Sequence, residues 1–241
     1  MKCLIIAAGK GSRLRSLAEI KPLVPLNKKP LIERVIDSAM DAGVNDFYVV
    51  VGYKGSSVRT HLEKVSLAKK VPITIIENGE WERANGISVL KAKPYFSEPF
   101  LLMMGDHIFD AGIARLLIRQ PRDNDRILLA VDEDLENSFI DIEDVTRVWV
   151  QQNQIKEIGK GIKNYNCFDT GIFLCGTTLF KAIEESSING DDSLSGGVRF
   201  LAKKGRAQAK AINGLFWCDI DDPNNFKQAE EYLSSLSENC N

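Results

Sequence analysis

The sequence predicts an α/β fold, with a Rossmann-like, mixed but mostly parallel central sheet flanked by helices and with antiparallel hairpins added late in the chain. Two observations support this prediction. Short apolar runs alternate with amphipathic segments over roughly the first hundred residues, as is typical of βαβ units. The later part of the chain contains alternating, hairpin-like strands instead. Because 44% of the 241 residues are hydrophobic and no linker or repeat divides them, we expect a single domain over residues 1–241.

The first half of the chain supplies the parallel part of the expected sheet. Its first strand, over residues 2–8, is apolar without a helical period, which indicates burial on both faces. An amphipathic helix then follows Pro30 and ends at Gly43. The same alternation predicts strands over 45–53, 72–78 and 99–106, separated by helices over 56–70 and 86–93.

The second half contains the expected antiparallel elements. A helix near 111–120 and a strand over 126–131 precede an acidic stretch at 132–144, which we expect to lie away from any anion-binding end of the molecule. Alternating residues at 146–159 predict a hairpin that turns at Gln152 and Asn153. Further strands are expected over 168–176 and 208–220, the latter with a type I′ turn at Asn213 and Gly214, before a helix that starts at Pro223 with Asp222 as its cap.

Composition and charge exclude several classes of protein. Lys and Arg number 31 against 33 Asp and Glu, so the net charge of −2 lacks the basic excess of nucleic-acid binders. No apolar run approaches the length of about 20 residues that spans a bilayer, and the N-terminal run stops at Gly9 and Lys10, too soon for a signal peptide. The five cysteines are scattered without a CxxC pair, which argues against disulfides or zinc. We expect a cytoplasmic protein that neither spans a membrane nor binds nucleic acid.

A glycine-rich loop follows the first strand. The segment LIIAAGKGSRL places Gly9 and Gly11 where parallel sheets open into ligand clefts. Small residues at this point let backbone N–H groups approach an anion, and Lys10, Arg13 and Arg15 add positive charge. A polyphosphate is the ligand that such a loop favours.

Two common glycine-rich motifs do not fit this loop. The dinucleotide-binding pattern needs a third small residue where Leu14 stands, and an acid where Lys28 and Lys29 lie. A Walker A loop needs a longer spacing between its glycines and a Gly-Lys-Ser/Thr ending. Hydride transfer and P-loop chemistry are therefore disfavoured, and a plain turn with incidental glycines is the alternative for the loop taken alone.

Carboxylates follow two apolar strands. Asp106 ends the run FLLMMGD, while Asp219 and Asp221 flank Ile220, which should direct their side chains to the same face. Triphosphate chemistry needs Mg²⁺, which prefers oxygen ligands, so Asp106 and one of the later pair are candidate metal ligands. A cap or turn role is the alternative for each, and His107 is a neighbour that would orient a ligand.

AAGKGSRL followed by KPLVPLNKKPLI resembles the signature of nucleotidyltransferases that join a nucleoside triphosphate to a sugar phosphate or an alcohol phosphate. The resemblance implies that Arg13 stabilises the pyrophosphate leaving group and that Lys21 contacts the transferring phosphate. It selects Asp219 to complete the Mg²⁺ site with Asp106, while Asp221 is either part of the site or structural. The loop that would wrap the triphosphate consists of Ala8, Gly9, Lys10, Gly11 and Ser12.

The second half resembles the acceptor-binding part of the same enzymes. In IKEIGKGIKNYNCFDTGIFLC, Lys160 has the family position of the cation beside the acceptor phosphate, with other nearby lysines as alternatives. The next strand opens with residues that would bind the acceptor, although this turn can also be purely conformational: Asp169, Thr170 and Gly171. We therefore assign the nucleotide to residues 1–110 and the acceptor to residues 111–241.

The stretch WERANGISVL bears on the choice of base and acceptor. It departs from the Gly-Thr-Ala type sequence of the enzymes that act on glucose 1-phosphate, and it resembles cytidylyltransferases that act on alcohol phosphates, above all inositol 1-phosphate, a route to phospholipid precursors. Inositol hydroxyls would find further polar partners in Asn166, Ser193 and Ser195. Asn85, and likewise Glu77 or Asn78, could offer donor and acceptor groups to the base, and Gly86 is expected to belong to the same nucleotide-binding region.

We therefore expect a Mg²⁺-dependent enzyme that converts CTP and inositol 1-phosphate into CDP-inositol and pyrophosphate by direct in-line attack on the α-phosphate. Alternatives are a hexose- or heptose-phosphate nucleotidyltransferase using another nucleoside triphosphate, a glycosyltransferase, a non-catalytic nucleotide-sugar sensor, and a choline-phosphate cytidylyltransferase with a cage drawn from Trp81, Trp149 and Tyr165. A homodimer is compatible with the sequence. Whether the chain works with, or is fused to, a membrane phosphatidyltransferase stays open.

Overall fold

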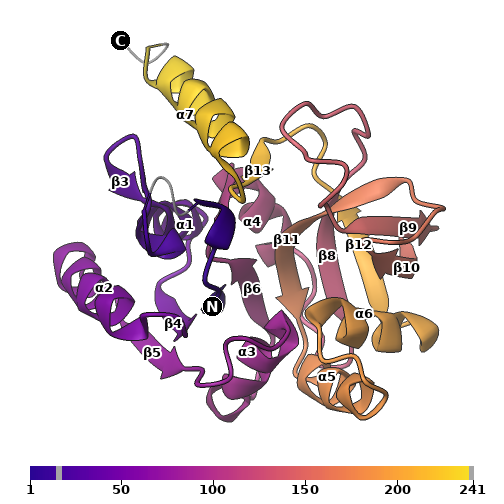
Figure 1. Cartoon of the computed structure of the whole chain (residues 1–241). Helices are drawn as coiled ribbons and strands as arrows, with labels where there is room; N and C mark the ends of the chain where they lie inside the picture. Colours follow the sequence, from indigo (N-terminus) through magenta and orange to yellow (C-terminus); the bar gives the residue numbers. More distant parts are fainter. Residues whose placement is uncertain (15–17, 239–241) are drawn as a thin grey trace.

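The computed structural model describes residues 1–14 and 18–238, so Arg15, one of the expected phosphate-binding cations, lies outside the described residues. These residues form a mixed central sheet of nine strands (Figure 1). All strands except β10 and β11 run in the same direction, which confirms the predicted mixed, mostly parallel α/β sheet. In spatial order the strands are β5 (Ile73–Glu77), β4 (Asp46–Val51), β1 (Lys2–Ala7), β6 (Phe100–Met104), β11 (Cys167–Cys175), β8 (Ile127–Asp132), β12 (Ala207–Ala211), β10 (Gln154–Gly159) and β9 (Arg147–Gln151).

Helices cover both faces of the sheet (Figure 1). In β1, Cys3 and Ile5 point to one face and Leu4 and Ile6 to the other, and all four are buried. This two-sided burial explains why the first strand is a continuous apolar run. The first face packs against α1 (Leu31–Asp41), α2 (Gly55–Lys69) and α4 (Ala111–Ile118), and the second against α3 (Asn85–Lys91), α5 (Thr178–Ile188) and α6 (Leu194–Lys203).

Smaller elements gather at the end of the sheet where the glycine-rich loop leaves β1. The last helix, α7 (Pro223–Glu238), begins with the predicted cap, because Asp222 Oδ1 accepts hydrogen bonds from Asn224 N at 2.7 Å and Asn225 N at 2.9 Å. None of the helices in the described residues is long and apolar enough to cross a membrane. The short elements at this end are β2 (Pro25–Leu26), β3 (Lys29–Pro30), β7 (His107–Phe109), β13 (Trp217–Asp219) and the 3₁₀ turns Ser12–Leu14 and Lys21–Leu23. A third 3₁₀ turn, Lys93–Tyr95, lies at the opposite end, where Lys2 Nζ donates to the Tyr95 carbonyl at 2.8 Å.

The two predicted turns serve different purposes. Gln152 and Asn153, with φ of 52° and 61°, join β9 and β10 as the expected hairpin. Asn213 and Gly214 also have positive φ, 53° and 78°, as a type I′ turn requires. The strands around them do not pair, however, because β12 lies in the main sheet and β13 pairs with β7. This second turn therefore connects β12 in the main sheet to β13, the strand that ends at Asp219, and does not close a hairpin.

The sequence patterns predict neither α5 nor α6. The patterns miss α6 because it contains two adjacent glycines, and glycine lowers helix propensity. The structure explains the pair by close packing: a Cβ on Gly197 would lie 2.5 Å from Ile183 Cγ1 of α5, and one on Gly196 would lie 2.5 Å from Ser186 Oγ. Tertiary packing between the two helices thus outweighs local propensity.

Candidate active site

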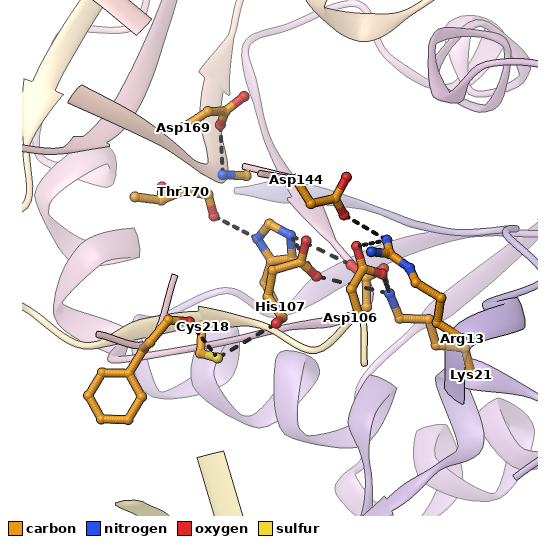
Figure 2. A network of polar contacts seen from close by, with 12 residues as sticks. Arg13, Lys21, Asp106, His107, Asp144, Asp169, Thr170 and Cys218 are labelled. Carbon is orange, nitrogen blue, oxygen red and sulfur yellow. Dashed lines mark hydrogen bonds and ion pairs between the residues drawn. The ribbon is translucent and has the colours of Figure 1, made fainter. Parts of the chain in front are cut away.

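Strand pairing brings the two candidate metal carboxylates together. Asp106 follows β6, and β7 begins at the next residue. Because β13 pairs antiparallel with β7, Asp219 lies opposite His107, and Ile220 N donates to the Asp106 carbonyl at 3.1 Å. Residues more than a hundred positions apart in the chain therefore form one cluster beside the loop that follows β1 (Figure 2).

Lys21 lies in the middle of three carboxylates. Its Nζ donates to Asp106 Oδ2 at 2.6 Å and to Asp221 Oδ1, and lies 4.0 Å from Asp219 Oδ1. The side chain is only 6% exposed. Burial lowers the pKa of Lys21, but the charges of the three aspartates outweigh this and raise its pKa, so the ammonium stays protonated. Asp221, whose role the sequence leaves open, belongs to this cluster.

Gly11 makes room for Lys21. Its φ is +59°, and a Cβ at this position would lie 2.3 Å from Lys21 Cβ. No larger residue fits both the backbone conformation and the space. The second glycine of the predicted loop thus fixes how closely the loop approaches the buried lysine.

The carboxylates and His107 form a donor set that fits a divalent cation. Ligand atoms of Asp106, His107 and Asp219 all lie within 4.8 Å of one another. Asp219 Oδ1 is buried and accepts no hydrogen bond within the described residues, as expected of an oxygen that awaits a cation. His107 Nδ1 donates to the Thr170 carbonyl at 2.8 Å, which directs Nε2 toward Asp219 Oδ1 at 3.5 Å. The two carboxylates are the oxygen ligands that Mg²⁺ prefers.

Charge pairing shifts the pKa values of this donor set in different directions. Burial lowers the pKa of His107, but Asp219 and Asp106 outweigh it and raise the pKa to about 10. Burial raises the pKa of Asp106, yet Lys21 and His107 lower it below its usual value. Burial and repulsion from Asp106 raise the pKa of Asp219. With a pKa of about 10, His107 is protonated at neutral pH and offsets part of the charge of the two carboxylates, so the oxygens of Asp106 and Asp219 are the atoms of this set that could hold a divalent cation.

Arg13 and Lys160 both reach a carboxylate that the sequence patterns do not single out. Arg13 Nη2 donates to Asp144 Oδ2 at 2.6 Å and to Asp221 Oδ2 at 2.7 Å, and Lys160 Nζ donates to Asp144 Oδ1. The hydrogen bond that Arg13 donates to Asp144, with the charge of Asp221, raises the pKa of Arg13 against the effect of burial. The expectation that the acidic stretch at 132–144 lies away from the anion-binding end is therefore wrong. The summed charge of residues 132–144 does not determine where the loop between β8 and β9 places Asp144, the last aspartate of the stretch.

The remainder of the glycine-rich loop lies beside this cluster. Ala8 is buried, and its carbonyl accepts a hydrogen bond from Tyr53 N at 3.0 Å, while Gly9 and Ser12 are exposed. Lys10 Nζ lies 5.4 Å from the centre of the Tyr53 ring, an arrangement that supports a cation–π contact. The exposed backbone of the loop and its cations are thus placed to receive an anion.

The predicted acceptor residues divide between the cleft and the core. Asp169 and Gly171 line the cleft, and Asp169 Oδ1 accepts from Gly171 N at 2.7 Å. Burial raises the pKa of Asp169 to about 6. Thr170, in contrast, is fully buried, and its hydroxyl donates to the Ala130 carbonyl at 2.8 Å. Its side chain therefore points away from any acceptor, because neighbouring residues of a strand face opposite sides.

The predicted base contacts are mostly engaged elsewhere. Glu77 is 72% exposed and pairs with Arg59 at 2.9 Å outside the cleft. Asn78 is buried, and its amide donates to Ser88 Oγ and accepts from Glu80 N. Asn85 lines the cleft, although its Oδ1 accepts from Leu194 N at 2.9 Å.

Gly86 has a packing role beside Asn85. A Cβ at this position would lie 2.3 Å from the Asp192 carbonyl oxygen. Of the three predicted base contacts, only Asn85 lines the cleft. Position at a strand end placed Glu77 and Asn78 at the correct edge of the sheet, but local hydrogen bonds and an ion pair turn their side chains from the cleft.

The cleft itself joins both halves of the chain. The acidic loop contributes Phe139, Ile140, Asp141 and Asp144, and the start of α7 contributes Asn225, none of which the patterns identify. Asn225 is buried and opens toward the cleft from the first turn of its helix, a position that the Asp222 cap marks in the sequence. The other lining residues are Asn85, Met104, Asp106, His107, Val145, Thr146, Lys160, Asp169, Gly171, Leu194, Ser195, Trp217, Asp219 and Asp221.

A mixed α/β sheet with a cationic glycine-rich loop and a carboxylate cluster at one end of a cleft is the arrangement of a nucleotidyltransferase domain. Residues 3–204 match the family described as MobA-like NTP transferase domain, and the chain belongs to this family. The resemblance that the N-terminal motifs suggest is thereby confirmed.

Many proteins are similar to the chain, including the following three. The "Bifunctional IPC transferase and DIPP synthase" of Rubrobacter xylanophilus is 32% identical over 233 residues, which cover 95% of this chain and 51% of that protein. The "UTP--glucose-1-phosphate uridylyltransferase AglF" of Haloferax volcanii is 30% identical over 245 residues, covering 97% and 96%. The solved inositol-1-phosphate CTP transferase from T. maritima superposes with a TM-score of 0.87 at 29% identity, covering 98% and 96%. The chain spans about half the length of the Rubrobacter relative.

Proposed function

We propose that the chain is a cytidylyltransferase that transfers CMP from CTP to inositol 1-phosphate and releases pyrophosphate. The observation that carries the proposal is the likeness over nearly the whole of both chains to the T. maritima protein, which its title describes as an inositol-1-phosphate CTP transferase. The name of the Rubrobacter relative supports the same substrate class. Only the nucleotidyl transfer is proposed, because the chain spans about half of that relative.

The reaction assigned to the site is a direct displacement. An oxygen of the acceptor phosphate forms a bond to the α-phosphorus of CTP, and the bond from that phosphorus to the bridging oxygen of pyrophosphate breaks. Both reactants are anions, so the chain must offset their repulsion and hold them in line. No covalent intermediate with a side chain is needed.

Residues of the cluster have separate tasks in this proposal. Asp106 and Asp219 would hold Mg²⁺, which when bound supplies charge neutralisation on the triphosphate. Arg13 and Lys10 would bind the departing pyrophosphate, and Lys21 the transferring phosphate. Lys160 would hold the acceptor phosphate, and Asp169 would accept hydrogen bonds from acceptor hydroxyls.

A sugar 1-phosphate is the second candidate acceptor. The Haloferax relative, named for glucose 1-phosphate and UTP, matches this chain over nearly the full length of both proteins. Choline phosphate is less well supported, because the aromatic residues considered for its ammonium group do not line the cleft: Trp81, Trp149 and Tyr165.

A matrix of triphosphates and acceptors tests the proposal. The purified protein is assayed with Mg²⁺ for pyrophosphate release from CTP, UTP or dTTP, each with inositol 1-phosphate, glucose 1-phosphate or choline phosphate. We expect the highest kcat/KM for CTP with inositol 1-phosphate. Faster turnover of any sugar 1-phosphate would overturn the acceptor assignment, and binding of CTP without pyrophosphate release from any pair would favour the non-catalytic sensor.

A further inference from the structure

Asp144 joins two cations that come from distant parts of the chain. It lies near the end of the loop between β8 and β9, and its two oxygens are used separately: Oδ2 accepts from Arg13 Nη2 at 2.6 Å and Oδ1 accepts from Lys160 Nζ. Figure 2 shows the Arg13 side of this bridge. Arg13 follows β1 and Lys160 follows β10, so the carboxylate connects the two halves of the site.

The bridged cations are the ones to which the proposed function assigns substrate phosphates. Within the described residues, Asp144 is the only acid in ion-pair contact with Lys160. Asp144 and Lys160 also line the cleft together. A single carboxylate therefore lies between two phosphate-binding groups, with one oxygen toward each, as two oxygens of a phosphoryl group would.

The bridge is suited to being broken. The side chain of Arg13 is 48% exposed and that of Lys160 is 58% exposed. The Asp144 side chain is 26% exposed, so solvent reaches each ion pair mainly from the cation's side. Ion pairs of this kind contribute little net stability, because solvent screens the charges and ordering the long side chains costs entropy. A polyphosphate, with more charge and more acceptor oxygens than a carboxylate, competes successfully for both cations.

We propose that Asp144 occupies the position of a substrate phosphate in the free enzyme, where it pairs with Arg13 and Lys160, and that it is displaced when a phosphate binds. This inference rests on the proposed function for the identity of the phosphate, but the ion-pair geometry that carries it is independent of the acceptor. Its consequence is that Asp144 competes with substrate for the cations.

The test compares Asp144→Asn with a matched control, Glu143→Gln. Glu143 is the exposed neighbour of Asp144, forms no ion pair within the described residues and does not line the cleft, so both variants lose one negative charge on the same loop. The Kd for inorganic pyrophosphate is measured by titration calorimetry with Mg²⁺. Asp144→Asn should bind pyrophosphate about 3- to 10-fold more tightly than the original protein, and Glu143→Gln within about twofold of it.

Unchanged or weaker pyrophosphate binding by Asp144→Asn, in a protein that unfolds at the original temperature, overturns the inference. If Asp144→Asn does not fold, Asp144→Ser, which also removes the charge, is used in its place. Equal tightening by Glu143→Gln also overturns it, since that result reflects general charge. Turnover separates the two proposals: transfer to inositol 1-phosphate without tighter binding by Asp144→Asn refutes only the inference, and tighter binding without transfer refutes only the acceptor assignment.

Discussion

At the scale of single residues, Lys21 sets the charge balance of the site. Three aspartates would repel one another strongly in a partly buried cluster, and the one buried ammonium among them offsets that repulsion. In the proposed function, the same lysine would become available to a phosphate when a divalent cation neutralised the carboxylates. The sequence identifies Lys21 only by its place in a motif, because a lysine followed by proline in a 3₁₀ turn carries no local sign of burial.

Asp106→Asn should lower the turnover by about 100-fold or more, because the amide is a poor ligand for a divalent cation. The fold should persist, since Lys21 keeps its contact with Asp221. We expect the free energy of unfolding to change by less than about 2 kcal/mol. Steady-state pyrophosphate release and urea unfolding measure the two effects.

The control for this variant is Asp41→Asn, an exposed aspartate at the end of α1 that loses the same charge far from the cluster. Its turnover should match that of the original protein. Near-normal turnover of Asp106→Asn would remove Asp106 from the metal site.

Asp169→Asn should stabilise the protein at neutral and higher pH. Burial raises the pKa of Asp169 to about 6, above its value of about 4 in an unfolded chain, so the folded state binds the proton more tightly. Stability contributed by this group therefore falls as the pH rises from about 4 to about 6, and the full cost of the buried charge remains above that window. Asparagine avoids the cost and can still accept from Gly171 N.

Urea unfolding at pH 4, 6 and 8 checks this prediction. The gain in the free energy of unfolding should reach about 1–3 kcal/mol at pH 8 and vanish near pH 4. A gain of equal size at every pH would show that the charge of Asp169 is not its cause. If Asp169 also binds acceptor hydroxyls, the stabler variant should turn over more slowly.

At the scale of elements, the periodicity of the sequence predicts the strands and helices of the first half because each is amphipathic or buried on both faces. It fails at α6, where Gly196 and Gly197 serve helix packing. It fails also at β7, a three-residue strand that is defined only by its partner β13. Elements whose identity depends on a distant neighbour leave no local period to detect.

Gly11→Ala tests how the glycine-rich loop depends on backbone conformation. A side chain at φ +59° is strained, and its Cβ would overlap Lys21. We expect the free energy of unfolding to fall by about 1–3 kcal/mol, and the turnover to fall as Lys21 is displaced. Gly9→Ala is the control for stability, because no atom lies within 4 Å of a Cβ there and its φ is not positive. An equal loss of stability in both variants would contradict a special role for Gly11.

At the scale of the whole molecule, the convergence of the loop after β1 with Asp106 is predictable, because the ends of the parallel strands β1 and β6 meet at one edge of a sheet. Asp219 joins them by a different route, the antiparallel pairing of β13 with β7 outside the main sheet. The position of Asp144 is not predictable, since it depends on the path of a long loop between β8 and β9 and on cations from both halves. Glu77 and Asn78 show the same limit of sequence-based prediction, because they lie at the expected edge of the sheet but their side chains do not line the cleft. Strand order places a residue at the correct edge, but only the completed packing decides where its side chain points.

The division into a nucleotide half, 1–110, and an acceptor half, 111–241, should be functional and not a division into separately folding units. Strand β11 from the second half pairs with β6 from the first, and the apolar cores on the two faces of the main sheet each contain residues of both halves. Unfolding should therefore be a single cooperative transition.

Trp81 reports on the first half and Trp149 and Trp217 on the second, so we compare Trp81→Phe with the double variant Trp149→Phe and Trp217→Phe. In each variant the urea midpoint from tryptophan fluorescence should coincide with that from far-ultraviolet circular dichroism. The opposite result would be a fluorescence midpoint that differs between the two variants, together with two steps in circular dichroism. It would mean that the shared sheet does not couple the two halves of the chain, and that the cleft joins two independently stable units.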